Sequence, residues 1–190
     1  NDPLGDEIMH EILKIDIGYL IQRVNYPTGT VLVKLKGGIP NYTIIENVAW
    51  DHIPLTEDMK QLAKRADAIC FGTLAQRSKT SRKTIQTLLS FVSKDAYRIF
   101  DINIRQHYYS KEIIVSSLRN CNVFKINDDE LLLIKKIFEI DTKTETDACK
   151  WFVETFNLKY MILTAGADYS AIYTFNDVSY IKTPKVEVAD

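Results

Sequence analysis

The sequence predicts an α/β protein in which helices cover both faces of a parallel sheet and a small β-layer is attached near the N-terminus. From residue 52 onward, short apolar runs alternate with stretches that have helical periodicity. The runs are apolar throughout, as expected for strands that are buried on both faces. Residues 19–51 lack helical periodicity and contain Gly and Pro turn signals, which predicts the β-layer.

The N-terminal part is expected to start with a helix and to continue as the β-layer. Apolar residues at helical spacing predict a helix from about Asp6 to Ile17, and Gly18 provides its stop. Extended stretches then predict strands at residues 19–24, 30–35 and 42–45, with turns at residues 27–29 and at Gly37-Gly38.

Residues 1–18 and 52–190 are assigned to the α/β body, and residues 19–51 to the β-layer. Helical periodicity predicts body helices at residues 56–66, 81–94, 110–119, 131–138 and 146–156, the first of them capped by Thr56. Apolar runs predict strands at residues 68–71, 97–102, 122–126 and 159–163. A hairpin of residues 171–175 and 178–181 is expected around Asn176-Asp177.

The composition excludes several classes of protein. Among 190 residues, 24 are Lys or Arg and 25 are Asp or Glu, so the net charge of −1 argues against a dedicated nucleic-acid or anionic-membrane binder. No apolar run approaches the roughly 18 residues that a membrane span needs. Cys70, Cys121 and Cys149 are widely spaced, which argues against a disulfide framework or a zinc site and makes the cytoplasm the expected location.

Polar residues follow the apolar runs of the predicted sheet, at the edge where α/β proteins bind their ligands. Asp101, Asn103 and Arg105 occupy alternate positions, and alternation in an extended segment points side chains the same way. A carboxylate, an amide and a guanidinium would then converge on one volume that can hold hydroxyls and an anion. The alternative is a solvated strand end with a local ion pair, and the pattern favours neither.

Two further polar stretches follow predicted strands. In Asn127-Asp128-Asp129-Glu130 the local pattern favours an Asn N-cap with a capping box through Glu130, although a carboxylate there could also position hydrated magnesium beside a nucleotide. In Thr164-Ala165-Gly166, small residues allow the backbone to approach a phosphate. A single glycine is weak evidence for that role, and a plain turn is the alternative.

Taken together, several stretches resemble the PfkB (ribokinase-like) family of carbohydrate kinases, and within it most closely the fructokinases. In chain order they are NDPLGDEI, YPTGTVLVKL, GGIPNY, NVAWDHI, CFGTLAQRS, FDINIRQHYYS, FKINDDEL and LTAGADYSAIY. The match covers essentially the whole chain, and the order and spacing of the stretches make it specific. The resemblance implies a three-layer α/β sandwich with residues 19–51 as a β-stranded lid.

The resemblance also implies an activity, which is transfer of the ATP γ-phosphoryl group to a sugar hydroxyl, with Mg²⁺ and with fructose as the expected sugar. The partners would be ATP and a small sugar, with no nucleic acid and no membrane, and the lid would also form a homodimer interface. This chemistry needs in-line positioning and neutralised phosphate charge more than covalent help from the protein.

On the sugar side, the resemblance implies that Arg105 contacts the sugar and the transferred phosphate, and that Asp101 and Asn103 bind the sugar. Two motifs of the family are absent from the sequence. A Gly-Gly and Asn sugar-binding motif is expected before Asn1, and a Gly-Ala-Gly-Asp motif with the catalytic base is expected beyond Asp190. We therefore expect a fragment of a longer chain, and we expect the 190 residues as written to be inactive.

On the nucleotide side, Asn127 and Glu130 match an Asn-x-x-Glu motif, in which Asn127 would bind the nucleotide and Glu130 would hold Mg²⁺ through water. Thr164 and Gly166 match a Thr-x-Gly nucleotide loop. Tyr169 stands where the family usually has Gly, and a side chain there is expected to disfavour a turn that needs positive φ.

Three alternatives stay open. The chain could come from a kinase for another sugar or for a nucleoside, because specificity depends on the segment expected before Asn1. It could also be a non-catalytic sugar- or nucleotide-binding protein, since a fold alone does not prove activity. The β-layer could act only as an oligomerisation surface.

Overall fold

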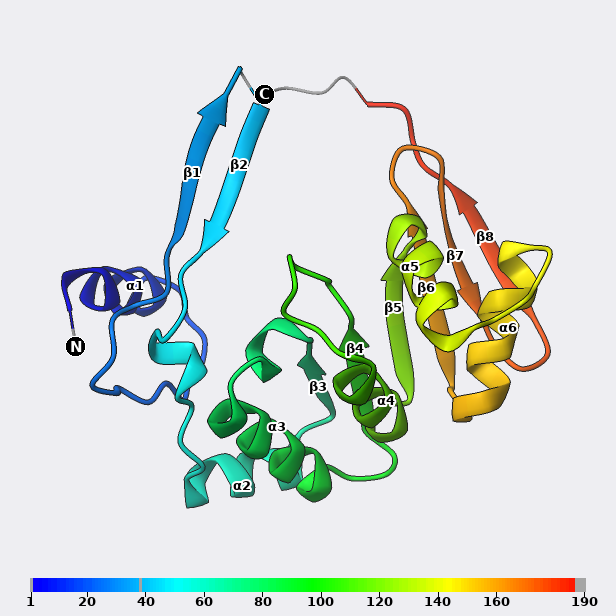
Figure 1. Ribbon diagram of the computed structural model, residues 1–190. Coiled ribbons are helices and arrows are strands. Elements are labelled where there is room, and N and C mark those ends of the chain that lie inside the picture. The colour runs from blue at the N-terminus through cyan, green and yellow to red at the C-terminus, as the bar shows by residue number, and fades with distance from the viewer. Residues whose placement is uncertain (1, 38, 187–190) are drawn as a thin grey trace.

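The computed structural model describes residues 2–37 and 39–186 of the chain and contains two sheets (Figure 1). The strands are β1 (Val31–Lys36), β2 (Ile39–Ile44), β3 (Ala68–Phe71), β4 (Tyr97–Asp101), β5 (Val123–Asn127), β6 (Tyr160–Ala165), β7 (Tyr169–Tyr173) and β8 (Val178–Lys182). The helices are α1 (Pro3–Leu13), α2 (Glu57–Arg65), α3 (Lys79–Phe91), α4 (Lys111–Asn120), α5 (Asp128–Phe138) and α6 (Glu145–Phe156). Within the described ranges, no helix is both long and apolar enough to cross a membrane.

The larger sheet has the order β3-β4-β5-β6-β7-β8 and gives the body its α/β character. Neighbouring strands from β3 to β6 are parallel, as the alternation of strands and helices predicts. The strands β7 and β8 follow through short turns and are therefore antiparallel to their neighbours, which confirms the predicted hairpin. The predicted α/β class with a small second sheet is confirmed.

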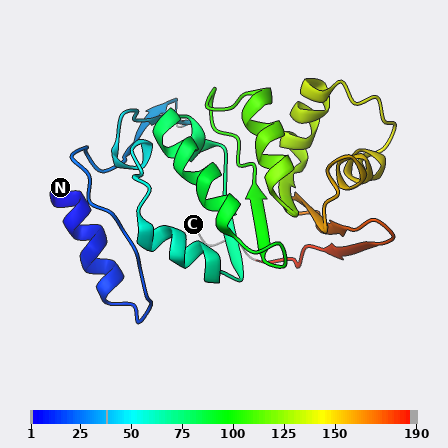
Figure 2. The same ribbon diagram turned by 90° about the horizontal axis from the view of Figure 1, so that it is seen from below.

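One face of this sheet carries the hydrophobic core. The strand register places Phe71, Phe100, Phe124 and Met161 side by side across β3 to β6, and all four are buried. The rings of Phe71 and Phe100 are 5.4 Å apart, and those of Phe100 and Phe124 are 5.5 Å apart. Figure 2 shows α3 to α6 on the same side of the sheet, where they cover these residues.

The opposite face of the sheet is much more open. Cys70 and Ile172 lie on it and are exposed, and Ile99 and Ile162 are half-buried. Of the two helix layers expected for a three-layer sandwich, the described residues supply the one that covers the phenylalanine face (Figure 2). The apolar side chains of the open face are the ones that a second layer would bury.

The segment expected to form the lid contains an antiparallel hairpin of β1 and β2, which extends away from the larger sheet (Figure 1) and is called the lid below. Gly37 has a φ of +60°, in keeping with the turn predicted there, and Gly38 lies outside the described residues. The prediction of a strand at residues 19–24 is wrong. An extended segment becomes a strand only when its N–H and C=O groups pair with a neighbour, and Tyr19 and Ile21 are exposed without a ladder partner among the described residues.

Helix α1 begins earlier and ends earlier than the periodicity predicts. Asp2 is its N-cap and accepts a hydrogen bond from the Gly5 N–H (2.8 Å), and Pro3 occupies the first helical position. The Asp2 carboxylate also accepts bonds from the Thr28 N–H and hydroxyl, both at 2.6 Å. These bonds fix the start of the helix against the segment that leads into the lid.

Candidate functional site

The carboxyl ends of the parallel strands meet at one edge of the sheet, where β3 and β4 are held closely together. The Thr73 side chain is fully buried and its hydroxyl donates a hydrogen bond to the Ile102 carbonyl (2.7 Å). A Cβ on Gly72 would lie 2.9 Å from the Asp101 carbonyl oxygen, so only glycine fits there without a shift. Gly72 and Thr73 therefore fix the backbone that carries the next polar residues.

Asp101 is paired with a lysine that the sequence analysis did not single out. The Lys125 ammonium donates to the Asp101 carboxylate over 3.0 Å, and both side chains are about one-third exposed, at 40% for Lys125 and 32% for Asp101. The register of β4 and β5 places both residues on the open face of the sheet. A lysine inside the otherwise apolar strand was the signal, because a charge in such a strand requires a partner.

Asp101, Asn103 and Arg105 do not lie in the continuous extended segment from which their common direction was expected. Strand β4 ends at Asp101, and Asn103 has a φ of +41°, so the alternation of an extended chain stops there. Gln106 is also left-handed, with a φ of +48°. Left-handed conformations of non-glycine residues are costly and concentrate at functional sites, so this loop is held in place by its contacts.

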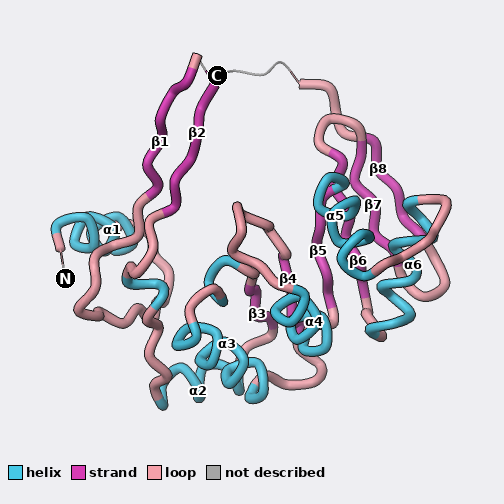
Figure 3. The backbone as a smooth tube through the Cα atoms, in the orientation of Figure 1, coloured by secondary structure: helices cyan, strands magenta, loops and turns pink. Residues whose placement is uncertain are grey.

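Arg105 lies at a cavity between the loop that follows β4 and the lid. The cavity has a volume of about 750 Å³. Its walls are formed by Val31, Asn41, Tyr42, Ile44, Ile104, Arg105 and Gln106. The Arg105 Nη1 atom lies 3.5 Å from its neighbour's carbonyl oxygen, at the limit of a hydrogen bond, which leaves the guanidinium available to an anionic ligand. Figure 3 shows the loop after β4 extending between the lid hairpin and β5.

Asn127 and Glu130 form the capping box that the local sequence favours. The Glu130 N–H donates to the Asn127 side chain (2.7 Å), and the Asn127 N–H donates to the Glu130 carboxylate (3.0 Å). The other Glu130 oxygen accepts a hydrogen bond from the Ile104 N–H over 2.7 Å. One carboxylate thus fixes the start of α5 and the residue next to Arg105.

The carboxylates at this edge fit a magnesium ion that is held mainly by phosphate. Among the residues that the structure describes, no group of three or more His, Cys, Asp or Glu side chains could enclose a metal ion. Mg²⁺ in kinases keeps several waters and uses one or two carboxylates together with phosphate oxygens. Both Glu130 oxygens already accept N–H bonds, so Glu130 fits a contact through water better than direct ligation.

Thr164 and Gly166 lie where β6 turns back into β7. Thr164 is paired with Asn127 of the neighbouring strand, so two of the predicted nucleotide residues are adjacent. Gly166 has a φ of +48°, and the Asp168 N–H closes the turn on the Ala165 carbonyl (2.9 Å). The turn connects antiparallel strands, which agrees with the alternative of a plain turn.

The expected conflict at Tyr169 is absent. Tyr169 is the first residue of β7 and is not left-handed, because Gly166 supplies the positive φ of the turn. The Tyr169 hydroxyl donates to the Glu145 carboxylate at the start of α6. Burial and this carboxylate raise the pKa of Tyr169, so the hydroxyl keeps its proton.

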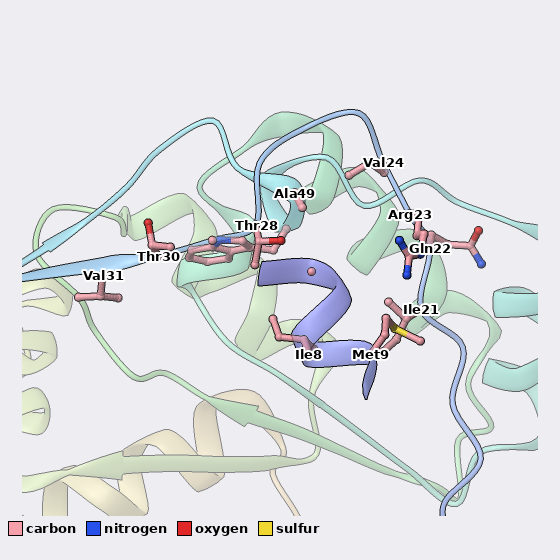
Figure 4. Close-up of a pocket in the computed structure, with 13 residues that line it drawn as sticks. Ile8, Met9, Ile21, Gln22, Arg23, Val24, Thr28, Thr30, Val31 and Ala49 are labelled. Atoms are coloured by element: carbon pink, nitrogen blue, oxygen red, sulfur yellow. The ribbon is translucent and has the colours of Figure 1, made fainter. Parts of the chain in front are cut away.

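A second cavity, of about 350 Å³, lies between α1 and the segment that leads into β1 (Figure 4), and Trp50 also lines it. Ile8, Met9 and Ile21 give it an apolar wall. Its one charged side chain, Arg23, is paired with Asp6 at 2.7 Å. This cavity lacks polar groups at a sheet edge, so the Arg105 cavity is the better candidate for the functional site.

Comparison with known proteins finds similarity to sugar kinases. The chain is 23% identical over 143 residues to an uncharacterized sugar kinase from Pyrococcus horikoshii, which is 71% of this chain and 46% of that protein. The crystal structure of the same sugar kinase aligns with a TM-score of 0.76 at 19% identity, over 98% of this chain and 60% of that chain. No protein-family model matches the chain.

Two further crystal structures share the architecture. A fructokinase with bound ATP from Xylella fastidiosa aligns with a TM-score of 0.83 at 15% identity, over 100% of this chain and 60% of that chain. An aminoimidazole riboside kinase from Salmonella enterica aligns with a TM-score of 0.76 at 15% identity, over 100% and 62%. This chain therefore spans about half of the curated relative and about three-fifths of the solved structures.

The order of the large sheet and the small hairpin beside it match these structures, so the chain has the ribokinase-like fold. The curated relative is also described as a sugar kinase, so the sequence similarity agrees with the expected resemblance to carbohydrate kinases.

Proposed function

We propose that the protein to which this chain belongs is an ATP-dependent carbohydrate kinase that phosphorylates a sugar hydroxyl, with fructose as the first candidate. The observation that carries the proposal is the cavity in which Arg105 faces the lid at the carboxyl edge of the sheet. The relatives support it: the Pyrococcus sugar kinase has been crystallised with ATP, and the Xylella structure is a fructokinase with bound ATP. We assign the activity to the complete protein.

In the proposed reaction, Arg105 binds the transferred phosphate, because a guanidinium offers planar paired donors for phosphate oxygens. Tyr42 and Ile44 of the lid exclude water from the acceptor side of the cavity. Asn127 and Thr164 contact the nucleotide at the adjacent strand ends, and Asp101 and Asn103 contact the sugar. Mg²⁺, held by ATP and through water by Glu130, supplies charge neutralisation when it is bound.

A nucleoside is the second candidate acceptor. The Salmonella neighbour was crystallised with aminoimidazole riboside and an ATP analogue. The lid side of the cavity here includes the Tyr42 ring and the apolar side chains of Val31 and Ile44, which suit the base of a nucleoside.

We also propose that residues 19–51 act as a lid on a body of residues 1–18 and 52–190, and that the lid forms a homodimer interface. Val31, Val33 and Leu35 are exposed on β1, at 51%, 55% and 73%. A two-stranded hairpin with such surface is marginal in water and gains stability from a partner. With ATP as phosphate donor, the proposed location is the cytoplasm. Light scattering tests the dimer, and a monomer at all concentrations would exclude it.

The deciding experiment is a coupled ADP-release assay on the full-length gene product with ATP and Mg²⁺. The acceptor panel contains fructose, ribose, 2-keto-3-deoxygluconate and aminoimidazole riboside. Acceptor-dependent ADP release is the expected result, and the best acceptor decides between the sugar and the nucleoside. If the folded protein binds ATP but releases no ADP with any acceptor, the result would instead support a non-catalytic binding protein.

A further inference from the structure

A buried arginine joins the base of the lid to the body. The Arg77 and Asp51 side chains are 7% and 5% exposed, and Arg77 donates to both carboxylate oxygens over 2.7 and 2.8 Å. Its Nη2 atom also donates to the Ile45 carbonyl over 2.6 Å. Arg77 follows β3 in the body, whereas residues 45–51 are the polypeptide that leaves the lid. One guanidinium therefore holds the connection between the two parts.

The same guanidinium is stacked between two aromatic rings. Its carbon atom lies 4.4 Å from the centre of the Trp50 ring and 4.6 Å from that of the Tyr108 ring. Trp50 lies beside Asp51, and a side chain at Gly29 would collide with its indole, so the chain entering the lid packs closely on it. Tyr108 belongs to the loop that carries Arg105, and its N–H donates to the Arg105 carbonyl over 3.0 Å.

Three hydrogen bonds tie the Arg105 loop directly to the lid, and the longest of them runs from the Tyr108 hydroxyl to the Ile44 carbonyl (3.3 Å). The Gln106 side-chain amide donates to the Tyr42 carbonyl in β2 over 2.7 Å. The Tyr108 hydroxyl donates to the Glu46 carboxylate over 2.7 Å, just beyond the end of β2. Burial and Glu46 raise the pKa of Tyr108, so this hydroxyl remains a donor.

On its other side, the loop is bonded to the body, because the Ile104 N–H donates to Glu130 in the first turn of α5. Arg105 thus lies between a residue bonded to the body and a residue bonded to the lid. Asn103 and Gln106 hold left-handed conformations at the two ends of this short stretch, and such conformations persist where contacts on both sides impose them. A movement of the lid would change the conformation of this stretch and hence the position of Arg105.

We propose that Gln106, Tyr108 and Arg77 are positioning residues, which couple the position of the lid to the orientation of the Arg105 side chain. The coupling acts within the proposed kinase site and rests on that function for its kinetic consequence. When the lid is in place over an acceptor, the Gln106 and Tyr108 bonds set Arg105 toward the cavity. When those bonds are lost, the lid moves more freely and Arg105 loses its fixed direction.

The test compares Tyr108→Phe and Gln106→Glu with wild type in the full-length protein. Tyr108→Phe keeps the ring on Arg77 but removes the bonds to Glu46 and to the Ile44 carbonyl. Gln106→Glu places a carboxylate against the Tyr42 carbonyl. Tyr97→Phe is the matched control, because its hydroxyl contacts Lys159 at the opposite end of the strands. Each site variant should raise the KM for the acceptor and lower kcat by about tenfold, and leave the KM for ATP unchanged. In Tyr108→Phe the cause is the lost charge-assisted bond to Glu46, and in Gln106→Glu it is the lost amide donor together with repulsion between the new carboxylate and the Tyr42 carbonyl.

Hydrogen exchange gives a readout that needs no catalysis. The amides of β1 and β2 should exchange about tenfold faster in both site variants than in wild type, with no change in Tyr97→Phe. Unchanged exchange in the lid would overturn the coupling, as would a lowered melting temperature without any split between the KM values for acceptor and ATP. If the wild type released no ADP with any acceptor, the proposed function would fail. The exchange rates would still decide whether Gln106 and Tyr108 hold the lid in position.

Discussion

Arg105 illustrates how an exposed residue can be tested for function without disturbing the fold. Arg105 lines the cavity, and the hydrogen bond of its guanidinium to the neighbouring Ile104 carbonyl is long, at 3.5 Å. In the full-length protein, Arg105→Ala should lower kcat about 100-fold or more, because it removes a donor from the transferred phosphate. The melting temperature should stay within about 2 °C of wild type, as expected for a surface substitution. Unchanged kinetics would remove Arg105 from the site.

Asp51, unlike Arg105, is buried, and its negative charge balances the buried positive charge of Arg77. Burial on its own would raise the pKa of Asp51, but the bonds from Arg77 and the Val48 N–H outweigh it and hold the pKa below its ordinary value of 3.8. Asp51→Asn leaves the Arg77 charge buried without a counter-ion and should cost about 3–5 kcal/mol in urea unfolding. Glu57→Gln, which breaks an exposed pair with Lys60, should cost about 0–1 kcal/mol. Equal effects of the two substitutions would contradict this account.

Asp2 gives a pH-dependent prediction. Hydrogen bonds from the Thr28 hydroxyl, the Thr28 N–H and the Gly5 N–H lower the pKa of Asp2 from 3.8 to about 2. A lowered carboxyl pKa adds stability that is complete above pH 3.8 and is lost as the pH falls toward 2. Thr28→Val removes the strongest of these donors, so an NMR titration should find the Asp2 pKa shifted back toward 3.8. A titration that stays near 2 would show that the hydroxyl is not the cause.

At the scale of elements, the first turn of α5 has two roles that substitutions can separate: it caps the helix, and it holds the loop that follows β4. Asn127→Ala removes the N-cap and should cost about 1 kcal/mol of stability. Glu130→Ala removes the reverse bond of the capping box and also the bond to the Ile104 N–H, so it should in addition speed exchange of the amides in residues 103–109. Hydrogen exchange with mass spectrometry measures both effects. Equal exchange in this loop for the two variants would mean that Glu130 does not hold it.

The elements that could be predicted from sequence are those whose signals are local. Apolar runs located β3 to β6, and the Asn127 to Glu130 spacing predicted the capping box, because burial and capping depend on neighbouring residues. The strand expected at residues 19–24 failed because a strand requires a partner, which no local pattern specifies. The extended segment expected from Asp101 to Arg105 failed because the backbone becomes left-handed at Asn103, next to residues bonded to Glu130 and to the lid, which no local pattern specifies.

The contacts that join the lid to the body were not predicted from the sequence for the same reason. Asp51 and Arg77 are separated by 26 positions in the sequence, and Gln106 reaches Tyr42 across 64. Nothing in the local pattern of either pair requires that they meet. A charged residue inside an otherwise apolar stretch, as with Lys125 in β5, is the signal that predicts a distant partner without naming it.

For the whole molecule, the uneven covering of the large sheet leads to the last prediction. Ile172 and Ile181 are 41% and 67% exposed on the open face, and β8 is an edge strand with every residue exposed. Open parallel sheets normally have both faces covered, and exposed flat edges pair with other chains. A protein made of residues 1–190 alone should therefore self-associate as its concentration rises.

Light scattering on this 190-residue protein tests the origin of that association. The double variant Ile172→Lys and Ile181→Lys should lower the apparent mass and the fluorescence of a bound hydrophobic dye, because it places charge on the open face and beside the β8 edge. Leu35→Lys, on the 73% exposed side chain of the lid, is the matched control on another surface. If only Leu35→Lys lowers the mass, the lid drives association and the open face does not. If the unmodified chain stays monomeric at all concentrations, neither the open face nor the lid drives self-association, and the prediction is wrong.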